Sequence, residues 1–241
     1  MKKVILSLAT LVAAAAVPSA AYAQLAFNAG AVTDYRYRGI SQTRLKPAVQ
    51  GGVDFAAGGF YVGAWASSIK WIKDAGGDAP AEIDLYGGYK GDIVKDSLTY
   101  DVGVLTYQYP SHKLSVSPVT TELYGALTFG PATVKYSHSV TNLFGFSDSK
   151  NSGYLDLSAS FDVGGGVMLA PHVGYQKVSG NSDFSYTDVA FGVSKDFNGL
   201  VVSATAVYAD VKKISGVPAY VSPSGKNLGK TGVVLGVKYN F

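Results

Sequence analysis

Apolar and polar residues alternate with a period of two along almost the whole chain. In EIDLYGGYK (82–90), Ile83 and Leu85 share one parity, while Glu82 and Asp84 share the other. The segments YLDLSASFD (154–162) and TGVVLGVKYNF (231–241) repeat this arrangement. A period of two is that of a β-strand with two different faces, and the 3.6-residue period of an amphipathic helix is almost absent. The pattern therefore predicts an all-β protein.

The alternating segments delimit about twelve predicted strands. They lie near 25–38, 47–57, 60–70, 82–91, 97–109, 120–129, 132–142, 153–162, 166–178, 186–196, 200–211 and 230–241. Most reach the length of roughly 9–11 residues with which a tilted strand crosses a bilayer.

The predicted connections alternate between short and long. Short turns are expected at 58–59, 92–96, 130–131, 164–166 and 198–199, and longer loops at 39–46, 71–81, 110–119, 143–152, 179–185 and 212–229. A membrane barrel with tight turns on one side and long loops on the other produces this rhythm. A β-sandwich is not expected to alternate short and long connections in this way.

Charged residues within the strands lie on the parity opposite to the apolar residues. A Lys or Arg that faces lipid at the bilayer centre costs about 2–4 kcal/mol, so a lipid-exposed wall would enforce this avoidance. A soluble β-domain would need larger side chains for its core, whereas the apolar face here mixes Ala, Gly, Val and Leu. The sequence predicts a transmembrane, antiparallel, up-and-down β-barrel.

The first residues have the features of a secretory signal peptide. Lys2 and Lys3 precede an apolar run that ends at Pro18, and Ala21-Tyr22-Ala23 has the form of a cleavage site. The run is too short for a membrane anchor. We expect a signal peptide at 1–23 and a barrel at 24–241. Without Lys2 and Lys3 the chain carries 18 basic and 17 acidic residues, which does not indicate a nucleic-acid partner.

A barrel of about twelve strands is wider than the eight-stranded barrel that side chains can fill. Its inward charges are therefore predicted to line a lumen and to tune its selectivity: Arg36, Arg38, Asp54, Glu82, Asp84, Asp101, Glu122, Lys135, Asp156, Asp188 and Lys238. Arg36 and Arg38 on the first strand are expected to form a basic strip with Lys238 on the last. Asp54, Glu82, Asp84, Asp101 and Glu122 are expected to form an acidic wall. The alternative is that these charges pair and plug the barrel.

Aromatic residues are expected mainly in girdles at the two membrane interfaces. This prediction covers Tyr35, Tyr37, Tyr61, Trp65, Trp71, Tyr89, Tyr100, Tyr136, Tyr154 and Tyr239. An aromatic track for sugars would instead need inward residues such as Tyr86, Tyr107 or Tyr124. Two positions are irregular: Pro171 predicts a bulge or a later strand start, and 60–70 is apolar on both parities, so its facing is unassigned.

The sequence offers little for catalysis or metal binding. It contains no Cys, and its three His residues lack metal-ligand spacing. His138 is expected to face outward, whereas Ser137 and Ser139 face inward, so a lipid hydrolase built on His138 is the least favoured function. We expect no cofactor, no metal and no enzymatic activity.

Several segments resemble the Gcw_chp family of proteobacterial outer-membrane proteins, also called TorF-type porins. They are TDYRYRGISQT (33–43), KPAVQGGVDF (46–55), GFYVGAWASSIKW (59–71) and EIDLYGGYKG (82–91). The resemblance implies an outer-membrane barrel of a Gram-negative bacterium. The C-terminal Tyr239 and Phe241 resemble the aromatic signal read by the barrel-assembly machinery, which would be a partner together with outer-membrane lipid.

The expected function is passive diffusion of small hydrophilic solutes through a charged lumen. The alternative is a non-conducting structural barrel that binds a partner through its external loops, above all 212–229.

Overall fold

The computed structural model describes residues 23–241, and the predicted signal peptide lies outside them except for Ala23. Twelve long strands dominate the described chain. They are β1 (Gln24–Val32), β4 (Ala48–Ala57), β5 (Phe60–Ser68), β6 (Ala81–Val94), β7 (Leu98–Gln108), β8 (Thr120–Phe129), β9 (Ala132–Ser139), β10 (Gly153–Ala159), β12 (Val167–Lys177), β13 (Tyr186–Phe197), β14 (Leu200–Asp210) and β17 (Gly232–Asn240).

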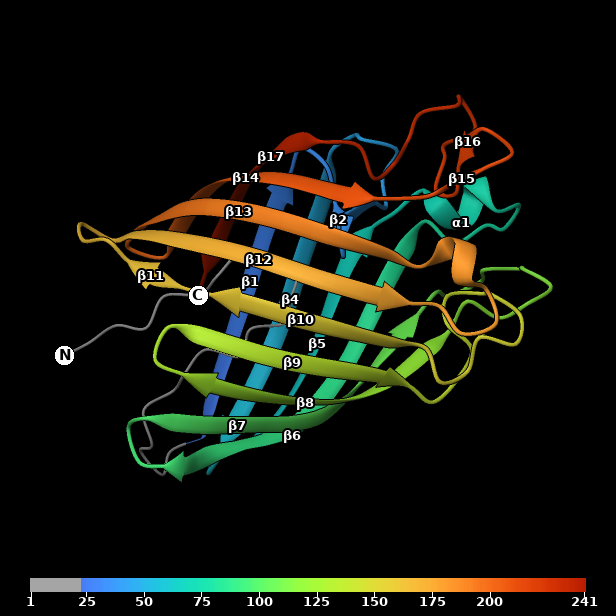
Figure 1. The fold of residues 1–241 in the computed structure, drawn as a ribbon. Coiled ribbons are helices and arrows are strands. Elements are labelled where there is room, and N and C mark those ends of the chain that lie inside the picture. Colours follow the sequence, from blue (N-terminus) through green and yellow to red (C-terminus); the bar gives the residue numbers. More distant parts are fainter. Residues whose placement is uncertain (1–22) are drawn as a thin grey trace.

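These strands form one closed antiparallel barrel (Figure 1). Each long strand pairs with the next one along the chain, and β1 pairs with β17 to join the two ends, for example Gly30 with Lys238. The predicted transmembrane-type, up-and-down barrel of twelve strands is therefore confirmed. Closure leaves no unpaired sheet edge in the wall.

Short turns and long loops lie at opposite ends of the barrel (Figure 1). The short-turn end includes Gly58-Gly59 and Asn198-Gly199, whose φ angles are all positive, as tight hairpins require. The other, long-loop end holds the small elements α1 (Trp71–Asp74), η1 (Ser182–Phe184), β15 (Lys213–Ile214) and β16 (Val217–Pro218). None of the described helices is long and apolar enough to cross a membrane.

Most outward positions are apolar and exposed, and most inward positions are buried or half-buried. One register row across β9, β10, β12 and β13 presents Val134, Leu157, Val173 and Val189 to the outside, with Leu157 53% exposed. The structure also assigns the facing of β5. Its Phe60 and Val62 are exposed on the outer wall, whereas Tyr61 is buried inside.

Pro171 causes no bulge and no late strand start, contrary to prediction. It lies within β12 and keeps a regular register with Phe191 of β13. The irregularity lies on the opposite side of β12, in its pairing with the chain of β10. This pairing stops after Ser158 and resumes at Phe161. Because Pro has no N–H to donate, the ladder is interrupted opposite it. This gap separates β10 from the short β11 (Phe161–Asp162).

The first strand is shorter than predicted. It ends at Val32, not near residue 38, and Thr33 makes the last hydrogen bonds that continue its pairing with β17. Its N–H donates to Leu235 O and its Oγ1 accepts from Leu235 N, both at 2.9 Å. Residues 33–47 then leave the wall.

If the outer wall contacts lipid, Leu157→Arg should destabilise the barrel in bilayers by about 2–4 kcal/mol, whereas Leu157→Ala should cost much less. Urea titration of folding into phosphatidylcholine vesicles measures both variants. Equal stability of the two would contradict a lipid-facing wall.

Candidate functional site: a charged lumen crossed by a hairpin

Residues 33–47, named here the lumen hairpin, are organised by a tight turn and one carboxylate. β2 (Arg36–Tyr37) pairs with β3 (Ile40–Ser41) around Arg38-Gly39, whose φ angles are 45° and 80°. Two successive positive φ values are characteristic of a type I′ turn. At the base, Asp34 accepts hydrogen bonds from Arg36 Nε and from Ser41 Oγ at 2.5 Å.

The lumen hairpin contacts opposite walls of the barrel. The Tyr35 hydroxyl donates to Glu82 Oε1 of β6 at 2.5 Å, and Arg38 reaches β8 and β12. A Cβ added to Gly39 would lie 2.7 Å from Asp188 Cβ on β13. The hairpin therefore crosses the lumen, and its tip fits tightly against the wall.

Arg38 is clamped at the hairpin tip. Its guanidinium makes two parallel bonds to Glu122 of β8, at 3.0 and 2.7 Å, and a third to Gln176 Oε1 of β12 at 2.7 Å. It also lies 4.2 Å from the ring centroid of Tyr154. Glu122 is 1% exposed, so this is a buried, bidentate ion pair.

Arg36 holds the hairpin to the loop between β14 and β17. Its Nη1 donates to Gly39 O and Leu228 O at 2.9 Å and to Lys230 O at 3.2 Å. The expected basic strip of Arg36, Arg38 and Lys238 on adjacent strands is therefore wrong. The two arginines lie on the hairpin, because the chain leaves the wall at Thr33 while its alternation continues.

Six of the ten residues of the predicted aromatic girdle lie inside the barrel or over its mouth. Tyr35, Tyr37, Tyr61, Trp65 and Tyr154 face the interior, and Trp71 lies in α1, with its ring centroid 5.1 Å from that of Tyr109. Tyrosine places a large apolar ring and a hydrogen-bonding hydroxyl in the same position, which suits a lumen rich in carboxylates. Tyr89, Tyr100, Tyr136 and Tyr239 remain on outward parities, while Tyr86, Tyr107 and Tyr124 face inward as predicted.

Tyrosine hydroxyls hold much of the predicted acidic wall. Glu82 accepts from Tyr35 and, at 2.7 Å, from Tyr109. Asp101 accepts from Tyr61 at 2.5 Å, and Asp54 accepts from Tyr86. Asp84 differs from them, because its buried Oδ1 has no hydrogen-bond partner.

A second charged cluster was not predicted from the sequence. His172 of β12 lies between two carboxylates, with Nδ1 2.8 Å from Asp156 Oδ2 and Nε2 2.8 Å from Asp188 Oδ1. Tyr154 donates to Asp188 Oδ2 at 3.0 Å. Parity alone could have indicated that His172 faces inward, because it shares the parity of Gln176 on β12. The two strands beside β12 carry the two aspartates.

These groups surround a cavity of about 260 Å³ in the lumen. Eight of the predicted lumen residues line it: Arg36, Arg38, Asp54, Asp84, Lys135, Asp156, Asp188 and Lys238. Glu82, Asp101 and Glu122 also lie on inward parities and are held by the contacts described above. Lys135 Nζ lies 3.9 Å from the ring centroid of Tyr124. Among residues 23–241, no group of three His, Cys, Asp or Glu side chains is arranged to hold a metal.

Apolar side chains narrow the lumen at the long-loop end. Ile69 and Ile72, both 0% exposed, pack with Ala48, Tyr35 and Tyr109 in one cluster. A second cluster joins Ile40, Tyr186, Ala209 and Leu228. Both clusters include residues of the lumen hairpin, so the hairpin and the mouth of the barrel form one packed unit.

His138 lies on the outer parity of β9, and its Nε2 is 3.2 Å from Asn151 Oδ1. Ser137 and Ser139, its neighbours in sequence, are buried on the inner parity. This arrangement does not provide a nucleophile beside the imidazole.

One protein family matches the sequence. The family Gcw_chp, described as "Bacterial protein of unknown function", matches residues 15–241. No curated protein matches the sequence.

Solved structures resemble the fold. A structure titled "NanC porin structure in rhombohedral crystal form" superposes with a TM-score of 0.54 at 12% identity and covers 90% of this chain and 99% of that one. A second, from work titled "Unveiling the Mechanism Behind the in-meso Crystallization of Membrane Proteins", has a TM-score of 0.50 at 7% identity and covers 90% and 83%. At these identities the likeness concerns the fold alone.

Removing Arg38 should destabilise the folded barrel by about 3–5 kcal/mol, because Glu122 would be left buried without its partner. The double variant Arg38→Leu/Glu122→Gln should recover much of this loss. A double-mutant cycle measures this: the free energy of unfolding by urea in detergent micelles is compared for wild type, both single variants and the double variant. Strict additivity would show that the two groups do not interact.

Proposed function

The chain belongs to the Gcw_chp family, and we propose that it is an outer-membrane porin of narrow bore for small hydrophilic solutes. The observation that carries this proposal is the cavity of about 260 Å³ inside the barrel, which Asp54, Asp84, Lys135 and Lys238 help to line, because a barrel of twelve strands is wider than one that side chains can fill.

The outer surface supports placement in a membrane. Leu85, Leu127, Leu157 and Leu235, from four separate strands, are each 45–53% exposed on the outer wall. Such a band is stable in hydrocarbon and unfavourable in water. In outer-membrane barrels the short turns face the periplasm and the long loops face outward, which gives the orientation. Export by residues 1–23, and assembly through Tyr239 and Phe241, belong to the same proposal.

The lumen hairpin forms the constriction of the proposed pathway. It lies across the bore with its tip clamped through Arg38 to Glu122 and Gln176. Solutes must pass beside the hairpin, along the cavity that Lys135 and Lys238 line. This geometry restricts the pathway to small solutes and is consistent with low conductance.

The charge of the lumen favours cations. Inside the described barrel, eight carboxylates face five Lys and Arg side chains, an excess of three negative charges with His172 neutral and of two with His172 charged. The carboxylates are Asp34, Asp54, Glu82, Asp84, Asp101, Glu122, Asp156 and Asp188, and the cations are Arg36, Arg38, Lys90, Lys135 and Lys238. Rings of acidic side chains give cation-selective channels.

Planar-bilayer recording tests the function directly. The refolded protein should give small, discrete conductance steps with cation preference. Absence of steps under conditions in which a general porin conducts would remove the pore proposal. It would favour the alternative of a non-conducting barrel that acts through its external loops, for which the buried clamp at the hairpin tip is the supporting feature.

The preference of the pore for cations should change in opposite directions when one acidic and one basic side chain at the cavity are neutralised. Asp84→Asn should lower the cation preference, since Asp84 lines the cavity and its carboxylate contributes negative charge there. Lys238→Gln should raise it. Reversal potentials in a KCl gradient provide the measurement. A shift of both variants in the same direction, or of neither, would show that these side chains do not line the pathway.

A further inference from the structure

The outer wall of β9, β10 and β12 is layered at its long-loop end. In the register of the sheet, Val134, Leu157 and Val173 form one outward row, and Tyr136, Leu155 and Tyr175 form the next row towards the loops. The two tyrosines are each 49% exposed. Apolar residues followed by outward tyrosines mark the boundary between hydrocarbon and headgroups.

Basic and polar groups follow directly above the tyrosines. The third row consists of His138, Gly153 and Lys177. Lys150 lies three residues before Gly153, in the loop that joins β9 to β10. A Cβ on Gly153 would lie 2.4 Å from the Tyr136 hydroxyl, so that hydroxyl leans over Gly153 towards this row.

The two ammonium groups are available for a ligand. Neither the Lys150 nor the Lys177 ammonium group has a hydrogen-bond or ion-pair partner among the described residues. Asp148 is the sole carboxylate in the loop between β9 and β10, and it is exposed. The patch therefore keeps a positive excess at headgroup depth.

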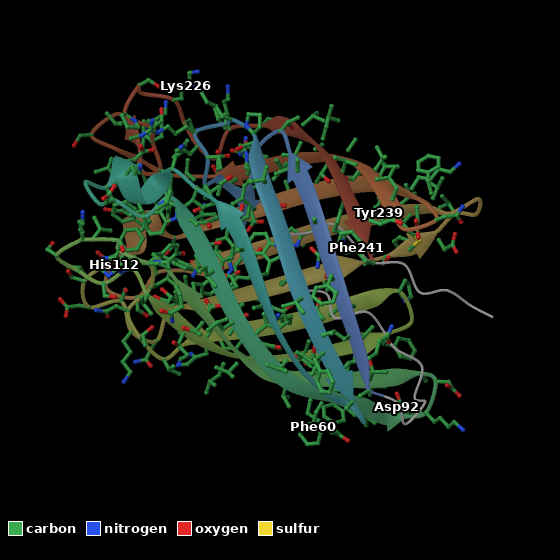
Figure 2. All side chains as sticks on the ribbon, turned by 180° about the vertical axis from the view of Figure 1, so that it is seen from behind. Phe60, Asp92, His112, Lys226, Tyr239 and Phe241 are labelled. Atoms are coloured by element: carbon green, nitrogen blue, oxygen red, sulfur yellow. The ribbon has the colours of Figure 1, made fainter. Side chains whose placement is uncertain are left out.

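The same sign of charge extends around the whole long-loop end. Among the described residues, its connections and strand ends carry ten exposed lysines against four exposed aspartates. The lysines are Lys46, Lys70, Lys73, Lys113, Lys150, Lys177, Lys212, Lys213, Lys226 and Lys230, and the aspartates are Asp78, Asp148, Asp183 and Asp210. The short-turn end exposes Lys95 and Lys195 against Asp92, Asp96 and Asp162. Figure 2 shows Lys226 and Asp92 at these opposite ends.

We propose that His138, Lys150 and Lys177, with the hydroxyl of Tyr136, form a docking patch for the phosphate group of an anionic lipid in the outward-facing leaflet. Lysine side chains at this depth extend to the headgroups while their methylene stems cover apolar surface. Two ammonium groups supply charge, and the Tyr136 phenol supplies a hydrogen-bond donor to a phosphate oxygen, while the imidazole, whose Nε2 contacts Asn151 Oδ1, lies beside them in the same row as Lys177. The patch requires a membrane-inserted barrel but not conduction.

The test compares two matched charge removals in the purified, detergent-folded protein. Lys150→Gln/Lys177→Gln removes the patch lysines, and Lys95→Gln/Lys195→Gln removes two lysines from the opposite end. Each protein is titrated with lipid A, a diphosphorylated glycolipid, and with phosphatidylcholine. Bound lipids are counted by native mass spectrometry. Heat-modifiable gel mobility verifies that each variant is folded.

The wild type should retain lipid A in preference to phosphatidylcholine. The patch variant should lose about thirtyfold in affinity for lipid A, while the Lys95/Lys195 variant should bind like the wild type. Unchanged binding by the patch variant would overturn the proposal. Equal losses in both variants would also overturn it, because they would indicate general attraction to a basic protein. Binding without conductance would leave this patch supported and the porin proposal rejected.

Discussion

Buried carboxylates impose the main constraint on this barrel. Its lumen holds Glu82, Glu122, Asp156 and Asp188 at 1–2% exposure, and a buried charge without a partner is strongly unfavourable. The wall supplies part of the compensation through tyrosine hydroxyls and His172. The lumen hairpin supplies the rest, since Tyr35 reaches Glu82 and Arg38 reaches Glu122. The same contacts that satisfy the wall therefore place a constriction across the bore.

The wall of the barrel was predictable because its physical signal is repeated in every strand. A membrane-spanning strand must present apolar residues to lipid at each second position, so the number of strands and the facing of most of them can be obtained from parity. In β5 parity was insufficient, because inward Tyr61 and Trp65 are themselves apolar enough to resemble a lipid face. In the sequence, these aromatic rings do not distinguish an inward side chain from one that faces lipid. In the structure, the hydrogen bond from the Tyr61 hydroxyl to Asp101 shows that Tyr61 faces inward.

The lumen hairpin and the histidine cluster could not be predicted, for different reasons. TDYRYRGISQT keeps a period of two after the chain has left the wall, because β2 and β3 form a small hairpin of their own. Alternation marks a strand but not the sheet to which it belongs. The contact of His172 with Asp156 and Asp188 depends on the register of three neighbouring strands, which turn lengths define only approximately.

Amide hydrogen exchange across residues 33–47 tests most directly whether the hairpin is packed in the lumen. The Ser41 N–H donates to Leu228 O at 3.0 Å, and the Gln42 N–H donates to Tyr35 O at 2.8 Å. In the micelle-folded protein these amides should exchange as slowly as those of the barrel strands. Exchange as fast as in the exposed turn at Lys95–Asp96 would contradict a hairpin packed across the bore.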